Sequence, residues 1–252
     1  MSYENFRQKY RPKFFSEVVG SKNQKIAKIL INIIKSGRIP PGIIFHGPPG
    51  SGKTTLALLL IKGLLCENFS GDVCGKCAAC LSFERNISAP IDYFYHDCTQ
   101  ITGKEVDKII ESLKTLTFTK SKLHIHFFDE FHRAREPVLE KFLTILERMK
   151  DILLIFALID LNHVGEAFRQ RVTTLKTYAP GIDELLPWLR RICALEGITV
   201  VGDNALRQLA QAAGQLPREC LGFLEKVSLR GEPLTTSLVK ELERDIEADP
   251  DH

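Results

Sequence analysis

Hydrophobic residues along this 252-residue chain follow one pattern up to about residue 178 and another after it. In the first part, short apolar or alternating runs take turns with segments whose apolar residues recur every three or four positions. The runs predict the strands of a sheet, and the spaced residues predict helices that cover it. The predicted strands lie at 42–45, 91–97, 123–130 and 152–159, and the predicted helices at 21–36, 56–66, 106–116 and 138–149.

The second part begins where Ala179, Pro180 and Gly181 interrupt this alternation. From there on the spacing predicts only helices, at 182–196, 203–214, 217–227 and 237–247. Strands that alternate with helices favour a parallel sheet with helices on both faces. The predicted fold is therefore an α/β domain over residues 1–178, followed by a small all-helical domain over residues 179–252.

The stretch FHGPPGSGKTT at 45–55 matches the P-loop pattern and lies between a predicted strand and a predicted helix. Backbone N–H groups of such a glycine-rich turn, with the positive end of the helix dipole, wrap the phosphates of a nucleoside triphosphate. Lys53 would reach the β- and γ-phosphates, and Thr54 would ligate Mg²⁺. A turn that matches by chance is the alternative. The expected nucleotide-binding residues are Gly47, Pro48, Pro49, Gly50, Ser51, Gly52, Lys53, Thr54 and Thr55.

The predicted strand at 123–130 ends in two acids, Asp129 and Glu130. The carboxyl ends of parallel strands are where an α/β sheet binds its ligands. Asp129 would hold the Mg²⁺ through water, and Glu130 would polarise the attacking water as a general base. A solvated strand end is the alternative. His124, His126 and His132 could be mistaken for a metal cluster, but strand alternation puts His124 and His126 on one face with no acidic partner between them, which favours structural histidines.

Composition restricts the class of protein more than its partners. With 44% hydrophobic and 26% charged residues, the chain is typical of globular proteins. It has no apolar run long enough to span a membrane and no signal-like segment at its start, so we expect a cytoplasmic location and no membrane partner. A net charge of +3 is too small to indicate nucleic-acid binding by itself.

Four of the seven cysteines follow the spacing C-x7-C-x2-C-x2-C within a short segment at about 66–82. Such spacing lets neighbouring thiolates converge on one metal, and four sulfurs in a tetrahedron suit structural Zn²⁺. An iron–sulfur cluster or buried free thiols are the alternatives. The other three, Cys98, Cys193 and Cys220, are expected to be buried apolar side chains. The predicted metal ligands are Cys66, Cys74, Cys77 and Cys80.

The N-terminal arm at 7–20 begins with a basic stretch and continues through Pro12 to two aromatic residues and an apolar pair. We expect an extended arm that docks through Phe14, Phe15, Val18 and Val19. A packed arm with no further role is the alternative.

Together, the P-loop, the Asp-Glu pair, the C-terminal helices and the four-cysteine insertion resemble the AAA+ ATPase subunits of bacterial DNA polymerase III clamp loaders, of the gamma/tau type. The resemblance covers about residues 3–227. It rests on Tyr10-Arg11-Pro12 with Val18-Val19-Gly20, on HGPPGSGKTT, on the four cysteines and on DEFHR at 129–133. It implies ATP as the nucleotide, a helical lid, and contact of the adenine with Tyr10, Pro12, Val18 and Val19.

The resemblance also assigns two arginines. Arg171 takes the position of the arginine finger that serves a neighbouring subunit, although Gln170 replaces the serine usual before it. Arg218 resembles a second sensor arginine on the lid. The polar sensor usual at the end of the preceding strand has no counterpart, because 157–159 are apolar up to Asp160. The family's collar domain is not matched either, and we expect a truncated product or a short relative that assembles otherwise.

The leading interpretation is an ATP-hydrolysing clamp-loader subunit that helps load a sliding clamp onto primed DNA. It implies ATP, Mg²⁺ and Zn²⁺ as cofactors, with other loader subunits, the sliding clamp and primer–template DNA as partners in a hetero-oligomer. A nucleotide-holding AAA+ scaffold with little turnover is the second interpretation. A remodeller of recombination or repair DNA intermediates is the third.

Overall fold

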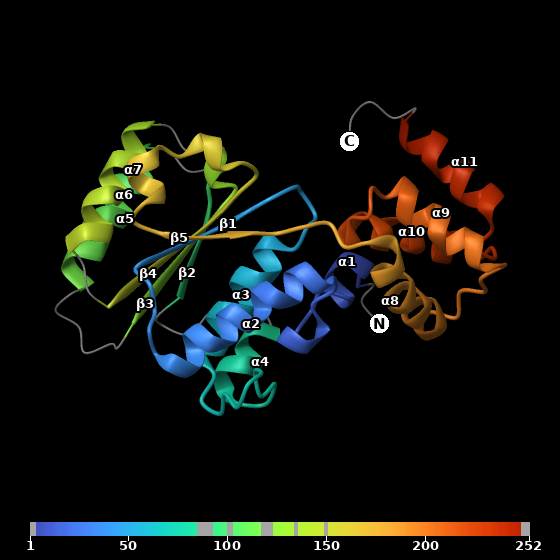
Figure 1. Cartoon of the computed structure of the whole chain (residues 1–252), viewed down its shortest axis with the longest axis horizontal. Helices are drawn as coiled ribbons and strands as arrows, with labels where there is room; N and C mark the ends of the chain where they lie inside the picture. The colour runs from blue at the N-terminus through green and yellow to red at the C-terminus, as the bar shows by residue number, and fades with distance from the viewer. Residues whose placement is uncertain are drawn as a thin grey trace.

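A five-stranded parallel sheet forms the centre of the structure, a computed structural model that describes residues 4–84, 93–99, 103–116, 123–133, 136–148 and 151–247. The strand order is β2-β3-β4-β1-β5 (Figure 1). The sequence prediction of a parallel α/β sheet is therefore confirmed. The strands are β1 (Gly42–His46), β2 (Tyr93–Asp97), β3 (His124–Asp129), β4 (Ile152–Leu158) and β5 (Thr173–Lys176).

The strand that the sequence pattern does not predict, β5, is the edge strand beside β1. It is four residues long, and only Leu175 among them is buried. Its backbone pairs with β1, with Thr173 beside Ile43 and Lys176 beside His46. A short strand with one buried side chain produces no apolar run, so only the pairing in the folded protein defines it.

Two groups of helices cover the two faces of the sheet (Figure 1). Ile43 and Phe45 of β1 pack with one group, whereas Ile44, between them, belongs to the core on the other face. This follows from the alternation of side chains along a strand. One face carries α2 (Ser21–Ser36) and α3 (Lys53–Leu65), beside α4 (Ala78–Glu84), and the other carries α5 (Gly103–Leu116), α6 (Glu136–Arg148) and α7 (Glu166–Arg169).

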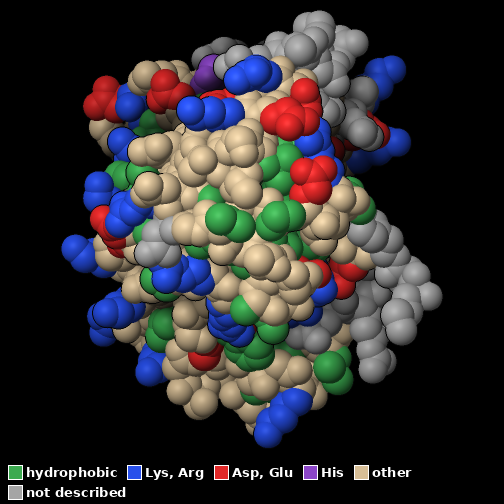
Figure 2. Space-filling view, turned by 90° about the vertical axis from the view of Figure 1, so that its right-hand side faces the viewer, with side chains coloured by type: hydrophobic (Ala, Val, Ile, Leu, Met, Phe, Trp, Pro, Cys, Tyr) green, Lys and Arg blue, Asp and Glu red, His purple; other side chains and the backbone are tan. Residues whose placement is uncertain are grey.

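The four helices after the sheet have a core of their own, centred on Leu189, Leu209, Leu224 and Val239. Each begins and ends within three residues of its predicted bounds. Figure 2 shows one face of this end of the molecule, where acidic and basic side chains are interspersed around apolar ones. The helices are α8 (Ile182–Leu195), α9 (Asp203–Ala212), α10 (Pro217–Arg230) and α11 (Thr236–Glu247).

The N-terminal arm is not wholly extended, which corrects the sequence expectation. It contains the short helix α1 (Phe6–Lys9) and the 3-10 turn η1 (Phe15–Glu17). The side chain of Asn5 accepts a hydrogen bond from the Gln8 backbone at 3.2 Å and so caps α1. Phe15 and Val18 are buried in the core of the sheet part, with Phe14 packed against it, whereas Phe6 is buried among the C-terminal helices and Val19 packs against them. The arm therefore joins the two parts.

Within the described ranges, no helix is both long and apolar enough to cross a bilayer.

Candidate nucleotide site and metal centre

A cleft of about 570 Å³ lies where the carboxyl end of the sheet, the N-terminal arm and the C-terminal helices meet. P-loop residues 49–55 line it together with Asp129 and Glu130. The arm contributes Tyr10, Pro12, Val18 and Val19, and the C-terminal helices contribute Arg218. The fold thus gathers predicted site residues from four distant segments into one open cleft.

The P-loop owes its path to glycines with positive φ. Gly47, Gly50 and Gly52 have φ of 146°, 73° and 99°. A Cβ on Gly47 would lie 2.5 Å from the carbonyl oxygen of Thr177, so glycine is required there for space as well. The loop leads directly into Lys53, the first residue of α3. It therefore presents the N-terminus of a helix, with its unpaired N–H groups, to an anion.

The Lys53 side chain is buried inside this loop. Its Nζ donates hydrogen bonds to the carbonyl oxygens of Gly47 at 2.9 Å and of Pro48 at 3.0 Å. Gly47 and Pro48 do not line the cleft themselves but hold the lysine that does. Burial lowers the pKa of Lys53, and the nearby carboxylates of Glu130 and Asp129 oppose that change. The amine and the two acids thus lie close enough to act on one ligand.

Thr54 and Asp129 lie side by side at the end of β3. The Thr54 hydroxyl donates to Asp129 Oδ2 at 3.0 Å, and the Tyr95 hydroxyl lies 3.4 Å from the same oxygen. Burial raises the pKa of Asp129, while its hydrogen bonds with Thr54 and the Glu130 backbone act in the opposite direction. A carboxylate and a hydroxyl at this separation are the oxygen donors that Mg²⁺ prefers, so the residues fit that ion.

Glu130 follows Asp129 in a left-handed turn with φ of 54°. Its side chain is about half exposed at the cleft, and its Oε2 lies 3.4 Å from His132 Nε2. Asp129 is instead directed to Thr54, so the turn separates the two neighbouring carboxylates. One acid can hold a metal while the other faces the cleft.

The cleft also contains aromatic residues that no motif indicates. Tyr95 of β2 and Trp188 of α8 line it with the arm. Tyr10, which the resemblance assigns to adenine, donates its hydroxyl proton to Glu196. Burial, and next this bond to Glu196, raise the pKa of Tyr10 above its ordinary value. Tyr95 could be predicted as a cleft residue only from the register of β2 beside β3, and the sequence alone does not give that register.

The two predicted arginines lie in different places. Arg218 lines the cleft over the P-loop, and its Cβ lies 3.4 Å from where a Cβ on Gly50 would be. Arg171 does not line the cleft. Its Nε donates to Glu147 Oε1 at 2.6 Å, and its Nη1 donates to the Ala167 carbonyl oxygen at 2.8 Å.

The end of β4 is apolar in the structure, as it is in the sequence. The resembled family usually has a polar sensor residue at this position. Leu158 is buried, and Ile159 after it is 39% exposed. The Asp160 carboxylate accepts the Asn162 backbone N–H at 3.1 Å and caps the 3-10 turn η3 (Leu161–His163). This bond lowers the pKa of Asp160.

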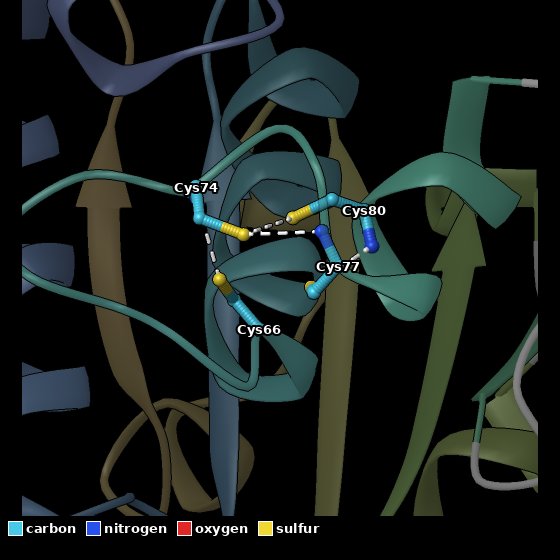
Figure 3. A group of neighbouring side chains, drawn as sticks. All are labelled: Cys66, Cys74, Cys77 and Cys80. Atoms are coloured by element: carbon cyan, nitrogen blue, oxygen red, sulfur yellow. Dashed lines mark hydrogen bonds between the residues drawn. The ribbon is translucent and has the colours of Figure 1, made fainter.

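The four predicted metal-ligand cysteines form one cluster at the end of α3 (Figure 3). Their sulfurs all lie within 4.8 Å of one another. Zinc–sulfur bonds of about 2.3 Å in a tetrahedron require sulfurs roughly 3.8 Å apart. Cys74 and Cys80 already meet that spacing, with sulfurs 3.9 Å apart. The donor set therefore fits Zn²⁺ with a small contraction.

Backbone N–H groups already point at these sulfurs. Those of Cys74 and Cys77 approach Cys66 Sγ and Cys74 Sγ at 3.4 and 3.3 Å. The N–H groups of Lys76 and Cys77 lower the pKa of the Cys74 thiol to about 6, whereas burial raises that of Cys80 to about 12. Hydrogen bonds of this kind favour thiolates, the form that binds metal.

The three remaining cysteines and two of the histidines, His124 and His126, lie in the interior. Cys98, Cys193 and Cys220 are buried, as predicted, and burial raises the pKa of their thiols to about 12, 11 and 12. His126 is buried and lies 3.0 Å from His96, Nδ1 to Nε2. Within the described residues, the cysteine cluster is the one group of three or more cysteines, histidines or acids whose ligand atoms lie close enough to share a metal ion.

Comparison with known proteins decides the family. A family model described as "DNA polymerase III, delta subunit" matches residues 22–177. The chain belongs to this family. A relative named DNA polymerase III subunit gamma/tau, from Mycoplasma pneumoniae, is 33% identical over 92% of this chain, which spans 33% of that relative. The DNA polymerase III subunit gamma of Buchnera aphidicola from Acyrthosiphon pisum is 26% identical, over 89% of this chain and 62% of its own length. The predicted likeness to the gamma/tau subunits is confirmed.

A plant protein is also similar to this chain. The protein STICHEL of Arabidopsis thaliana is 30% identical over 94% of the chain, which spans 20% of it. Among solved structures, the RuvB Holliday junction branch migration motor of Thermotoga maritima superposes with a TM-score of 0.65 at 19% identity. The superposition covers 97% of this chain and 74% of the RuvB chain. At that identity the likeness shows the fold alone, which agrees with the parallel α/β sheet and following helices predicted from the sequence.

Proposed function

We propose that this polymerase III family chain is an ATPase subunit of a clamp loader, which uses ATP to place a sliding clamp on primed DNA. The cleft supports the ATPase part, and the relatives' printed names support the replication part. A cytoplasmic location is part of the same proposal. The likeness to RuvB concerns the fold alone and does not favour the remodeller.

One observation supports the chemistry most directly. Thr54 and Asp129 are within 3.0 Å of each other, and Glu130, the next residue, faces the same cleft. Bound Mg²⁺ would supply positive charge at the phosphate oxygens, held by Thr54 and Asp129. Lys53 would stabilise the negative charge that develops on the γ-phosphate, while Glu130 would orient and polarise the attacking water.

The arm and the C-terminal helices would together recognise the rest of the nucleotide. Tyr10 joins them through its bond to Glu196, and Pro12, Val18 and Val19 line the same side of the cleft. Arg218 of α10 would contact the phosphates above the P-loop. We accordingly propose an ATPase domain at 1–178 and a lid at 179–252. ATP would bind between the two domains, so its binding could change the position of the lid.

Assembly with other subunits is part of the proposal. Arg171 lies outside its own chain's cleft and is about 38% exposed, so it is available to a neighbouring subunit once Glu147 releases it. We propose that it completes the neighbour's site. Other loader subunits, the sliding clamp and primer–template DNA are the partners that this role requires.

The cysteine cluster would hold one structural Zn²⁺. Four thiolates close the coordination sphere, and such a site has no open position for substrate. Its role would be to stabilise the segment between α3 and β2.

The test is single-turnover hydrolysis of ATP by the full chain, with and without primed DNA and a sliding clamp. We expect turnover that Glu130→Gln lowers by about 10²- to 10⁴-fold, the usual contribution of a general base. ATP binding should persist, because the carboxamide keeps the size of the side chain. Glu136→Gln, an acid on α6, is the matched control. Wild-type turnover in Glu130→Gln would contradict the assignment.

A nucleotide-holding scaffold is the second candidate. The apolar end of β4 favours it, since Asp160 bonds to its own turn and Ile159 offers no polar group. ATP binding without turnover under any of these conditions would support the scaffold over the ATPase.

A further inference from the structure

The carboxylate of Glu130 faces a histidine. Glu130 begins the turn after β3, and His132 lies two residues later in the 3-10 turn η2 (Phe131–Arg133). His132 Nε2 and Glu130 Oε2 are 3.4 Å apart. Phe131, between them, is fully buried among the aromatic residues of the core. The backbone of this turn is therefore anchored, and both polar side chains extend from the anchored segment.

The environment of His132 determines which ring nitrogen carries the proton. Its side chain is 12% exposed, and its ring centre lies 5.8 Å from that of His163 in η3. Burial lowers the pKa of His132, although the nearby Glu130 carboxylate opposes this, so the ring is neutral near pH 7. Nδ1 is buried with no hydrogen-bond partner among the described residues.

A neutral imidazole carries one proton, on either nitrogen. Placed on Nδ1, the proton would be buried without an acceptor, and Nε2 would turn a lone pair toward a carboxylate. Placed on Nε2, it is on the nitrogen that lies 3.4 Å from Glu130 Oε2. The second arrangement avoids both an unpaired donor and lone-pair repulsion, so the proton is on Nε2. At 3.4 Å the two groups are in contact without a formed hydrogen bond, and a small rotation of the half-exposed Glu130 side chain would let Nε2 donate to it.

We propose that His132 is a positioning residue for ATP hydrolysis, which holds the Glu130 carboxylate in the orientation that polarises the attacking water. This rests on the proposed function. Glu130 needs such a partner because its side chain is about half exposed and has several rotamers. A general base must lie within hydrogen-bond reach of the water, and small displacements reduce the rate strongly.

The position of His163 extends this arrangement. It belongs to η3, the turn that follows the apolar end of β4. Its ring packs near His132, so the turns after β3 and after β4 meet through two histidines. His132 would thus supply a polar contact to the proposed general base, whereas the end of β4 is apolar up to Asp160.

The experiment compares two substitutions at one position in the full chain. His132→Leu removes the donor at similar volume, whereas His132→Gln can place an amide N–H near the position of Nε2. We expect His132→Leu to lower the single-turnover rate by about 10- to 100-fold, a part of the usual general-base contribution. The dissociation constant of a fluorescent ATP analogue should change less than about twofold, because His132 does not line the cleft. His132→Gln should recover most of the rate.

A double substitution separates positioning from general damage. If His132 acts through Glu130, His132→Leu combined with Glu130→Gln should be no slower than Glu130→Gln alone, because the partner is already lost. An unchanged or higher rate in His132→Leu, a His132→Gln rate as low as that of His132→Leu, or additive losses in the double variant would overturn the positioning role. Wild-type turnover in Glu130→Gln would overturn the proposed function itself, and the positioning role with it.

Discussion

The nucleotide cleft and the cysteine cluster are built in opposite ways. The cleft collects residues from the arm, the P-loop, the end of β3 and α10, and it remains open. The cluster takes its four cysteines from the segment between Cys66 and Cys80, and it could hold a metal ion that those four thiolates would enclose. A closed site of local ligands can stabilise a fold, whereas an open site shared among distant segments can couple ligand binding to their relative positions.

Hydrogen bonds from the arm to Asp72 help connect the two regions. Asp72, inside the cysteine segment, accepts the backbone N–H groups of Phe15 at 2.9 Å and Ser16 at 3.0 Å. Those residues belong to η1, and Val18 just after it lines the cleft. The cysteine segment thus supports the arm that borders the nucleotide site, although it contributes no residue to the cleft.

The largest effect is expected from Arg171, which belongs to neither region. Arg171→Ala should leave ATP binding unchanged but lower turnover in the assembled complex by about 10³-fold or more, as for an arginine supplied in trans. Mixing tests this, because a Lys53→Ala chain with Arg171 intact should still activate a neighbour. Arg169→Ala, an exposed arginine on α7, is the control. If DNA-stimulated turnover is unchanged in Arg171→Ala assemblies, Arg171 does not act in a neighbour's site and only forms the ion pair with Glu147.

Within the cleft, Lys53→Ala should lower ATP binding and turnover by roughly 10²- to 10³-fold, the cost of losing a charge aimed at the developing anion. Folding should survive, because the substitution removes two hydrogen bonds worth about 1 kcal/mol each. Isothermal titration with ATP and thermal unfolding measure the two effects. Lys35→Ala, at an exposed position of α2, is the control. Wild-type turnover would contradict the P-loop assignment.

For the cysteine cluster we expect the opposite result to Lys53→Ala: a substitution should lower stability and leave ATP binding nearly unchanged. We expect one Zn²⁺ per chain, and Cys77→Ser should lower the unfolding temperature by about 5 °C, as a loss of roughly 2 kcal/mol does at this size. Affinity for ATP should change by less than about threefold, since no ligand of the cluster lines the cleft. Cys98→Ser tests a buried cysteine outside the cluster. Metal analysis that finds iron, or no metal in freshly purified reduced protein, would refute the zinc assignment.

The smallest effect is expected at the contact between the regions. Asp72→Ala leaves two N–H groups of η1 without their acceptor, which should cost about 1 to 2 kcal/mol of local stability. Hydrogen exchange at Phe15 and Ser16 should accelerate, and the dissociation constant for ATP should rise by about threefold. Asp107→Ala, on the exposed surface of α5, serves for comparison. Unchanged exchange at η1 would show that the bonds to Asp72 do not support the arm.

Sequence patterns were sufficient to predict those helices and strands whose apolar residues follow one another closely along the chain. Long apolar periodicities predicted α2, α6 and the C-terminal helices, and continuous apolar runs predicted β1, β3 and β4. They were insufficient for β5, with its single buried residue, and for α1, which begins at the Asn5 cap. The likeness to the gamma/tau subunits was visible for the same reason, because its motifs are contiguous. The roles of Arg171 and Arg218 stay predictions.

By itself, the sequence determined the P-loop, the Asp129-Glu130 pair and the cysteine spacing, because each depends on neighbours along the chain. Only the tertiary structure decided that Tyr95 meets Asp129, that Tyr10 bonds to Glu196, and that Arg218 borders the cleft while Arg171 does not. These contacts depend on which strands are adjacent and where the arm crosses between the two cores. Burial of apolar surface sets that arrangement, and it acts on the whole chain at once rather than on any short segment.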